Sequence, residues 1–193
     1  MKFLDIQLIG ISKAFEQIQV FKNLNLTFTE GRIHCIMGAS GIGKTTLLNL
    51  LMGLIKPDAG QIIGLEGIKI ASVFQEDRLI EHWDAIQNVK LVCEKSITVE
   101  QIEEEFRKVR LDDYKNKPVL YLSGGMRRRV AIIRAILAPS QLLILDEPFK
   151  GLDEELKNSV IRFLVEKTKG KTVIVVTHEK DEVEALGGNI VKL

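Results

Sequence analysis

The most chemically specific stretch of this sequence is Gly38-Ala39-Ser40-Gly41-Ile42-Gly43-Lys44-Thr45, which fits the pattern G-x-x-x-x-G-K-[ST] at every fixed position. Its glycines allow positive φ, so backbone N–H groups can turn inward around an anion. The ammonium of Lys44 supplies a charge for the β- and γ-phosphates of a nucleotide, and the Thr45 hydroxyl is a ligand for Mg²⁺. We interpret this stretch as a phosphate-binding loop rather than a glycine-rich turn that binds nothing.

Two carboxylates, Asp146 and Glu147, end an apolar run in the second half of the chain. Successive side chains of a strand point to opposite sides, so we expect these two acids to have different roles. Asp146 suits the shell of a Mg²⁺ ion, usually through water, and Glu147 suits the polarisation of an attacking water. The alternative is a solvated acidic turn, which the phosphate-binding loop in the same chain disfavours.

A second candidate for anion binding is Ser123-Gly124-Gly125, which opens a helical apolar stripe. Ser123 is a suitable N-cap, and the paired glycines leave the next backbone N–H groups open to an anion. Glycine inside a helix costs roughly 1 kcal/mol, so an ordinary capped helix start explains the pair poorly. Arg127, Arg128 and Arg129 follow at the positive end of the helix dipole. We predict that this basic run is a solvated or partner-facing surface and not a nucleic-acid site.

Two polar residues, Gln75 and His178, come directly after apolar runs that predict strands. Ligands of open α/β sheets bind at the carboxyl ends of the strands. His178 is therefore a candidate donor to a γ-phosphate oxygen or a holder of the attacking water, and Gln75 is a candidate ligand of Mg²⁺ or water. Taken alone, a surface or packed histidine and an exposed glutamine are the simpler explanations.

Apolar runs predict the elements that must position these residues. A strand over 33–37 precedes the phosphate-binding loop, and a helix over 46–51 follows it. The continuous apolar runs at 142–145 and 172–177 are typical of parallel strands covered on both faces, and residues 68–74 predict a further strand. These patterns predict an α/β nucleotide-binding core.

Two regions of the chain depart from that pattern. Near the N-terminus, Leu24, Leu26 and Phe28 alternate with polar residues, which predicts β structure. From about residue 77 to 138 the spacing is helical, and Thr98 with Gln101 forms a capping-box pattern. The apolar stripes of two predicted helices are Val99, Ile102, Phe106 and Val109, and then Met126, Val130, Ile133 and Leu137.

The bulk properties of the 193-residue chain fit one globular domain. Hydrophobic residues make up 46%, charged residues 27%, and the formal net charge is +1, which gives no reason to expect polyanion binding over the whole surface. No apolar run approaches the roughly 18 residues of a membrane span, and no signal peptide is recognisable. Cys35 and Cys93 lack metal-ligand or redox spacing, and Cys35 is expected to be a buried structural thiol. We expect a cytosolic protein.

In their order along the chain, these motifs resemble the ATP-binding cassette of ABC transporters, over essentially the whole sequence. The motifs that carry the resemblance are the phosphate-binding loop, Gln75, Ser123-Gly124-Gly125, Asp146-Glu147, Gly151-Leu152-Asp153 and His178.

The fold implied by this resemblance is an α/β P-loop NTPase core with a mostly parallel sheet flanked by helices. It adds an N-terminal antiparallel β subdomain. It also adds an α-helical subdomain between the glutamine loop, which contains Gln75, and the Walker B strand, which is the apolar run that ends at Asp146. A single domain over 1–193 is implied, with the nucleotide-binding core at about 1–76 and 139–193 and the helical subdomain at about 77–138. No C-terminal regulatory domain is expected.

The resemblance also assigns roles to individual residues. Phe15 would stack on adenine, where tyrosine is commoner, and Asp153 would lie in a loop that communicates between two copies. The nucleotide would be bound by Phe15, Gly38, Ala39, Ser40, Gly41, Ile42, Gly43, Lys44, Thr45, Thr46, Ser123, Gly124 and Gly125. Catalysis would use Glu147, His178, Gln75 and Lys44, and Mg²⁺ would be bound by Thr45, Gln75 and Asp146.

The implied function is ATP hydrolysis coupled to transport, with ATP and Mg²⁺ as cofactors. In a head-to-tail dimer, each ATP would lie between the phosphate-binding loop of one copy and Ser123-Gly124-Gly125 of the other. The partners would be transmembrane permease subunits, which hold the chain at the cytoplasmic face of the membrane, and a solute-binding protein. Residues 73–80 with Asn88-Val89 are similar to importers of the nitrate, sulfonate and taurine type, although Glu81-His82 replaces their usual Pro-Trp.

Three other functions are compatible with parts of the sequence. A cassette that drives division or lipoprotein release at a membrane shares all of the motifs. A soluble ABC ATPase acting on ribosomes or DNA usually carries two cassettes or long coiled coils, which this sequence lacks. A small P-loop kinase or GTPase would not explain Ser123-Gly124-Gly125.

Overall fold

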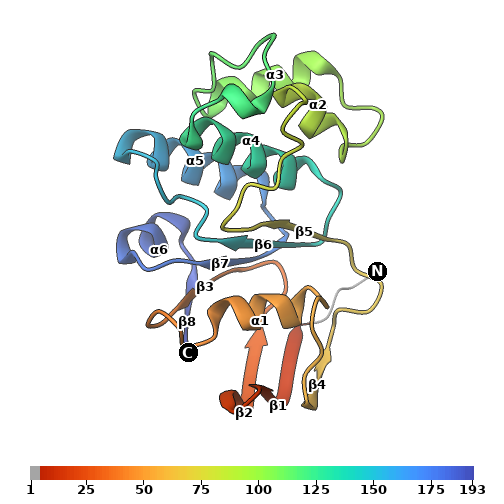
Figure 1. The fold of residues 1–193 in the computed structure, drawn as a ribbon, viewed down its shortest axis with the longest axis vertical. Coiled ribbons are helices and arrows are strands. Elements are labelled where there is room, and N and C mark those ends of the chain that lie inside the picture. The colour runs from red at the N-terminus through yellow and green to blue at the C-terminus, as the bar shows by residue number, and fades with distance from the viewer. Residues whose placement is uncertain (1–4) are drawn as a thin grey trace.

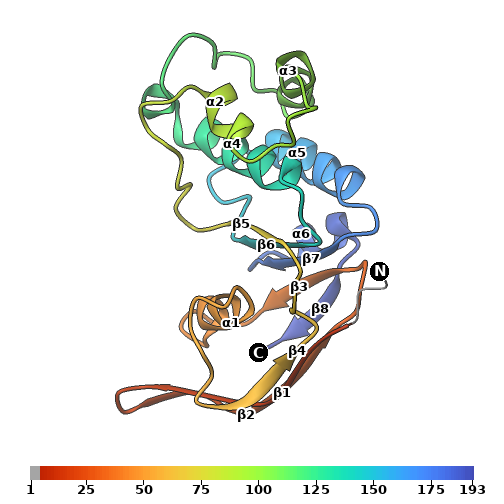
Figure 2. The same cartoon turned by 90° about the vertical axis from the view of Figure 1, so that its right-hand side faces the viewer.

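The computed structural model describes residues 5–193, which form two β-sheets and a set of helices stacked in layers (Figure 1). Helices α2, α3, α4 and α5 lie on one side of the larger sheet, while α1 lies on its other side, beside the smaller sheet. Figure 2 shows the same succession of layers from the side. Helices thus flank the larger sheet on both faces, as the α/β prediction requires.

The larger sheet is five-stranded, and every neighbouring pair of strands in it is parallel. The continuous apolar runs form its centre, where every residue of β6 and β7 is buried. The strand predicted over 68–74 is shorter than expected. In spatial order the strands are β5 (Ile70–Val73), β6 (Leu142–Asp146), β7 (Thr172–Val176), β3 (Ile33–Met37) and β8 (Asn189–Lys192).

The smaller sheet is antiparallel and three-stranded, with the order β2 (Ile18–Phe28), β1 (Ile6–Phe15), β4 (Ala59–Ile63). It contains the alternating residues near the N-terminus, of which Phe28 is fully buried. Helix α1 (Lys44–Leu51) fills the space between the two sheets, because Leu47 and Leu51 belong to one buried cluster with side chains of both. The expected antiparallel β region is therefore confirmed.

Helices dominate the segment between β5 and β6. The capping box at Thr98 and Gln101 is confirmed at the start of α3, and a second one, not predicted, joins Asp84 and Gln87 at the start of α2. The elements of this segment are α2 (Ala85–Lys90), α3 (Val99–Lys108), the 3-10 turn η1 (Val119–Tyr121) and α4 (Gly124–Leu137). After β6 follow α5 (Glu154–Lys167) and, after β7, α6 (Lys180–Leu186).

One residue of the predicted apolar stripe of α3 was assigned wrongly. Ile102 and Phe106 are fully buried, and so is Val109, which lies just past the end of the helix. Val99 is 42% exposed, because it occupies the first turn of the helix and the core begins one turn later.

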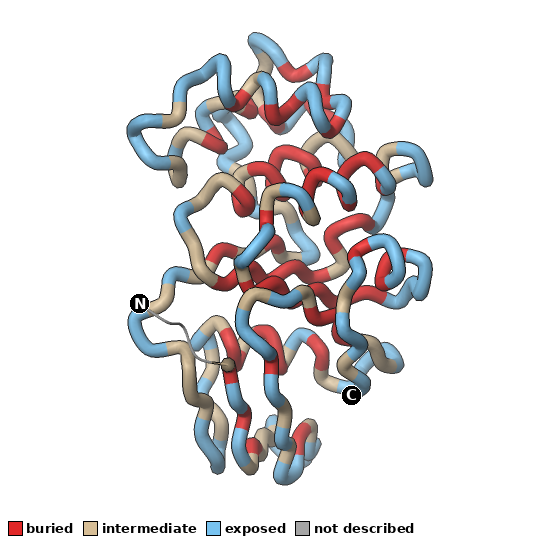
Figure 3. The backbone as a smooth tube through the Cα atoms, turned by 180° about the vertical axis from the view of Figure 1, so that it is seen from behind, coloured by how far each residue is buried: buried red, intermediate tan, exposed pale blue. Residues whose placement is uncertain are grey.

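The parallel sheet separates two hydrophobic clusters. Along β6, Leu143 and Leu145 pack into the cluster on the side of α4 and α5. Leu142 and Ile144 pack into the cluster on the side of α1 and the antiparallel sheet. Figure 3 shows the buried residues concentrated along the strands and on the helix faces that turn toward them.

The prediction of a solvated arginine run is wrong for Arg128 and Arg129, which are 8% and 7% exposed. Arg129 donates to the carbonyl oxygens of Val109 at 2.9 Å and of Arg110 at 2.5 Å. Arg128 likewise donates to main-chain carbonyls, in the segment that follows β5. Guanidinium groups satisfied by backbone oxygens can be buried, so a basic run need not face solvent.

Cys35 is buried, as expected, and burial raises the pKa of its thiol to about 11. Within residues 5–193, no helix combines the length and the apolar character needed to cross a bilayer.

Candidate nucleotide-binding site

The phosphate-binding loop connects the carboxyl end of β3 to the first residue of α1, in the predicted order of strand, loop and helix. Gly41 and Gly43 have φ values of 80° and 108°, a region that side chains disfavour. Gly43 is also the N-cap of α1, and no side chain caps the helix there. The first backbone N–H groups of α1 are therefore available to an anion.

Lys44 is held by its own loop. Its side chain is largely buried, and Nζ donates to the carbonyl oxygens of Gly38 and Ala39, at 2.9 Å each. A buried ammonium needs such partners. The two bonds keep the amine inside the curve of the loop, where a phosphate would lie.

The loop forms one wall of a pocket of about 210 Å³ at the carboxyl ends of the parallel strands. The structure brings four of the predicted strand-end residues to this pocket, from three different strands. Parallel strands place their carboxyl ends at the same edge of a sheet, which explains why residues so distant in sequence meet here. The lining residues are Ser40, Gly41, Gly43, Lys44, Thr45, Thr46, Gln75, Asp146, Glu147 and His178.

Asp146 is suited to hold a divalent cation. Its Oδ2 accepts a hydrogen bond of 3.3 Å from the Thr45 hydroxyl, while Oδ1 is buried and has no hydrogen-bond partner among residues 5–193. Burial, and then the negative charge of Glu147, raise the pKa of Asp146. A cation beside these two oxygens would relieve both effects. No group of three or more His, Cys, Asp or Glu side chains in the described chain could hold a metal, so further ligands would come from phosphate oxygens, Gln75 and water.

Glu147 does not follow the strand alternation that the sequence suggested. Strand β6 ends at Asp146, and Glu147 has a φ of 45°, a left-handed conformation that is rare outside glycine. Both carboxylates therefore line the same pocket rather than opposite sides of the sheet. Their roles still differ, because Asp146 faces Thr45, whereas Glu147 faces His178 and Lys150.

Sequence reasoning missed Lys150 as a member of the site. Its Nζ lies 2.9 Å from Oε2 of Glu147, and the Nε2 atom of His178 lies 3.3 Å from Oε1. The hydrogen bond from Lys150 is the largest of the effects that lower the pKa of Glu147, and His178 adds to it. Lys150 follows Glu147 in an irregular segment, where periodicity gives no signal of such a contact.

Some predicted nucleotide-binding residues lie outside this pocket. Ser123 caps α4 by accepting from the Met126 amide at 3.3 Å, so its predicted N-cap role is confirmed. Gly124 is exposed, and, apart from its chain neighbours and the backbone of its own helix, no atom of residues 5–193 lies within 4 Å of the position that a Cβ would take there. Phe15, at the end of β1, is 45% exposed and does not line the pocket either. The described chain thus presents its predicted site residues on separate surfaces.

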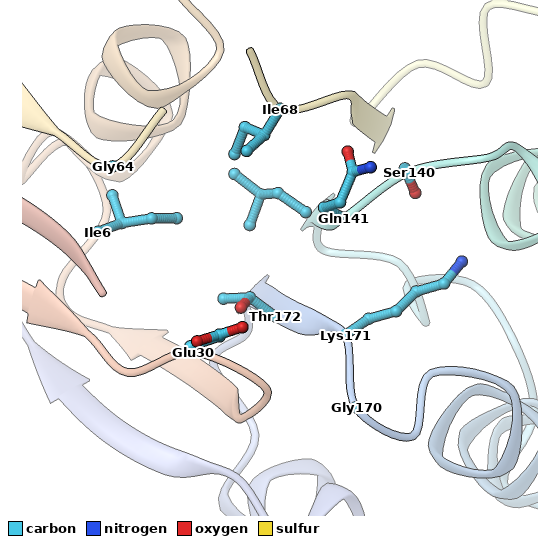
Figure 4. A pocket seen from close by; sticks show the side chains of 10 residues that line it. Ile6, Glu30, Gly64, Ile68, Ser140, Gln141, Gly170, Lys171 and Thr172 are labelled. Carbon is cyan, nitrogen blue, oxygen red and sulfur yellow. The ribbon is translucent and has the colours of Figure 1, made fainter. Parts of the chain in front are cut away.

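A second pocket, of about 130 Å³, opens at the opposite edge of the sheet, between the two sheets (Figure 4). Leu142 and Thr172, which line it, are the first residues of β6 and β7. Figure 4 shows Ile6 and Ile68 extending into this pocket. It lies at the amino ends of the strands and has no phosphate-binding loop, so it is not the nucleotide site.

The fold and the pocket define a P-loop nucleotide-binding protein. A family model described as ABC transporter matches residues 21–150, and the chain belongs to this family. One relative is the spermidine/putrescine import ATP-binding protein PotA of Fusobacterium nucleatum subsp. nucleatum. The two sequences are 34% identical over an aligned length of 203, which covers 96% of this chain and 54% of that protein. The chain thus spans about half the length of this curated relative.

Solved structures of ABC cassettes have the same fold. The dimeric structure of MJ0796, a bacterial ABC transporter cassette, has a TM-score of 0.85 at 29% identity, over 97% of this chain and 94% of that one. A post-hydrolysis state of the same cassette, bound to ADP and Pi, has a TM-score of 0.83 at 29% identity with the same coverage. The expected family and P-loop NTPase fold are confirmed.

Proposed function

We propose that the chain is the ATP-hydrolysing subunit of an ABC transporter and that it works as a head-to-tail pair of copies. One observation carries this proposal: the pocket holds the phosphate-binding loop and the polarising residues, while Ser123-Gly124-Gly125 lies outside it, with Ser123 and Gly124 exposed. The exposed start of α4 can bind an anion through its first backbone N–H groups, and a phosphate bound in the pocket of a second copy supplies one.

The surface around Ser123 supports such a pairing. A Cβ on Gly125 would lie 3.4 Å from Cδ2 of Leu152 and 3.8 Å from the carbonyl oxygen of Gly151. The two segments expected to face the other copy, at the start of α4 and just before α5, are therefore neighbours. The dimeric cassettes among the solved relatives also support the arrangement.

The predicted site residues have different parts in nucleotide binding and hydrolysis. Lys44 and the loop amides neutralise the charge of the β- and γ-phosphates. Glu147 accepts the proton of the attacking water, and His178 orients the γ-phosphate toward that water. Thr45, Asp146 and Gln75 would hold Mg²⁺, which supplies charge neutralisation of the phosphates when bound. Phe15 would stack on the adenine ring from the end of β1.

The residues after β5 are the proposed contact with the permease. A groove of about 430 Å³ there is lined by residues 75–79, Glu81, Val119, Leu120 and Arg127. Four large side chains with apolar surface stand exposed along it: Ile80 at 37%, Trp83 at 38%, Leu120 at 41% and Tyr121 at 73%. Because Gln75 lines both this groove and the nucleotide pocket, a membrane subunit bound here is coupled directly to the chemistry. Through this contact the chain would sit at the cytoplasmic face of the membrane.

The transported molecule is proposed to be a small solute delivered by a solute-binding protein. A relative named as a spermidine/putrescine importer supports uptake, and residues 73–80 resemble importers of small anions. The cargo would contact the permease and not this chain. Reconstitution with the permease and a panel of polyamines, nitrate, sulfonates and taurine would identify it.

The test of the hydrolytic dimer uses Glu147→Gln, which keeps the shape of the side chain and removes the base. We expect this variant to bind ATP, to hydrolyse almost none of it, and to elute as a dimer from size exclusion only with ATP. The matched control is the double variant Glu147→Gln/Ser123→Arg, which blocks the exposed helix start and should elute as a monomer. A Glu147→Gln protein that stays monomeric in ATP would contradict the proposal.

A further inference from the structure

Two arginines of α4, the buried Arg128 and the half-buried Arg134, bind the glutamine loop, defined as residues 74–78, and neither has a part in the function proposed above. Arg128 donates from Nη1 to the carbonyl oxygen of Phe74 at 2.6 Å and from Nη2 to that of Gln75. Arg134 donates to the carbonyl oxygens of Asp77 at 3.0 Å and Arg78 at 2.8 Å. Most main-chain carbonyls of the loop are therefore bonded to one helix.

The contact is built for a guanidinium group. The Arg128 side chain is 9% exposed, and its Nε lies 3.3 Å from Oδ1 of Asp77. Burial raises the pKa of Asp77, and Arg128 is the largest of the positive charges that oppose this rise. The planar fork of an arginine can donate to two neighbouring carbonyls at once, whereas a lysine is a single point of charge. Arg128→Lys therefore keeps the charge beside Asp77 and loses the paired hydrogen bonds.

The same helix carries both the bound loop and the exposed anion site. Helix α4 has its N-cap at Ser123, and Arg128 follows within its first two turns. At about 1.5 Å of rise per residue, the helix start and Arg128 lie less than about 10 Å apart on one rigid element. A displacement of the helix start must carry the main chain of Gln75 with it.

We propose that Arg128 is a positioning residue that fixes the Gln75 main chain to α4, so that the helix start that meets the second copy sets where Gln75 stands in its own pocket. This inference rests on the proposed function for the role of Gln75. It links two parts of each chain: the start of α4, which faces the second copy, and Gln75, which lines the chain's own nucleotide pocket.

The first test is a kinetic double-mutant cycle on the full chain. We expect Arg128→Lys to lower kcat for ATP hydrolysis by roughly tenfold to a hundredfold, as when hydrogen bonds of a charged group are lost, and to change the Kd for ATP less than about twofold. In a Gln75→Ala background the same substitution should lower kcat by less than about twofold, since it acts through Gln75. Lys167→Met is the matched control, because it removes the 2.7 Å bond from Lys167, the last residue of α5, to the buried Glu105 on α3 and leaves the glutamine loop intact.

The second test does not depend on activity. Hydrogen exchange of a peptide covering residues 74–78 should be at least about fivefold faster in Arg128→Lys than in the wild type or in Lys167→Met. Unchanged exchange would overturn the proposal. So would an Arg128→Lys substitution that lowers kcat by the same factor in the Gln75→Ala background as in the wild type. A wild-type protein without ATPase activity would refute the proposed function, while faster exchange in Arg128→Lys would still support the attachment of the loop to α4.

Discussion

Two side chains lie against the Glu147 carboxylate, with Nζ of Lys150 at 2.9 Å from Oε2 and Nε2 of His178 at 3.3 Å from Oε1. Only 16% of the Glu147 side chain is exposed, whereas Lys150 reaches it from a largely exposed position. Its pKa lies below the ordinary value, chiefly because of the hydrogen bond from Lys150. The general base of the proposed reaction is thus kept ionised at neutral pH.

This arrangement predicts a pH effect for Lys150→Met. The lowered pKa of Glu147 means that the ionised base persists to lower pH than in a free glutamate, so the acid limb of kcat/KM lies low. Without Lys150 the pKa rises and the acid limb should move to higher pH, with little change above pH 8. The measurement is the pH profile of kcat/KM, and Lys169→Met, an exposed lysine elsewhere, is the control. An acid limb that stays in place would show that Lys150 does not set this pKa.

Asp146→Asn should separate stability from activity. Burial raises the pKa of Asp146, so the folded state binds its proton more tightly than the unfolded chain does. The carboxyl therefore weakens the nucleotide-free fold once the pH exceeds its unfolded pKa, and this penalty is absent below that pH. At pH 7 the Asp146→Asn variant should therefore have a higher Tm, by roughly 2–4 °C for each kcal/mol gained in the free energy of unfolding. The same variant should lose Mg²⁺-dependent hydrolysis.

Calorimetry and thermal melts without nucleotide would test this prediction, with Asp153→Asn as the control. Asp153 is a helix N-cap, where an asparagine caps equally well, so its substitution should leave Tm nearly unchanged. A lower Tm for Asp146→Asn would mean that the ionised carboxylate is stabilising without a cation.

Lys44→Met should weaken ATP binding itself. The ammonium already donates to Gly38 and Ala39, so it is positioned before the nucleotide arrives. Loss of charge-assisted hydrogen bonds worth about 1.5–3 kcal/mol corresponds to a Kd that is roughly 10- to 150-fold weaker. Titration calorimetry with ATP measures this, and Lys56→Met, which removes an exposed charge beyond α1, should bind like the wild type. Equal affinity of the Lys44 variant would refute the role of the loop.

The two glycines of the loop should respond differently to alanine. A Cβ on Gly43 would lie 2.6 Å from Cγ1 of Val20 and 2.8 Å from Cζ of Phe21, while a Cβ on Gly41 meets nothing within 4 Å. Both positions have positive φ, so both variants carry backbone strain of order 1–2 kcal/mol. Gly43→Ala must in addition displace the side chains of Val20 and Phe21 on β2, and it should lower Tm and ATP affinity more than Gly41→Ala. Thermal melts and calorimetry on the pair check this, and equal effects would contradict it.

Much of the pocket could be predicted because its residues belong to motifs with fixed spacing at strand ends. Thr45 and Asp146 were placed near a common Mg²⁺ site from sequence, and the structure brings their side chains within 3.3 Å. Parallel β6 and β7 followed from continuous apolar runs, since strands buried on both faces leave no polar alternation.

The errors arise where the partner of a residue is distant or the backbone turns. Arg128 bonds to carbonyls that lie 53 and 54 positions away, and no local pattern of charge encodes such a partner. For Glu147, the alternation argument assumed that the strand continues, but its left-handed φ turns the chain and sends the side chain to the same pocket as Asp146. The contact of Lys150 depends on that turn and was invisible for the same reason.

Strand β6 sends Leu145 into the helical side of the molecule and Ile144 into the side of the antiparallel sheet. Adjacent positions of one short strand can therefore act as independent reporters of the two halves of the interior. Shortening Leu145 would loosen the layer that contains α4 and its attached glutamine loop, whereas shortening Ile144 would loosen the packing beneath the phosphate-binding loop. A pair of conservative substitutions at these two adjacent positions would thus show which of the two layers unfolds first.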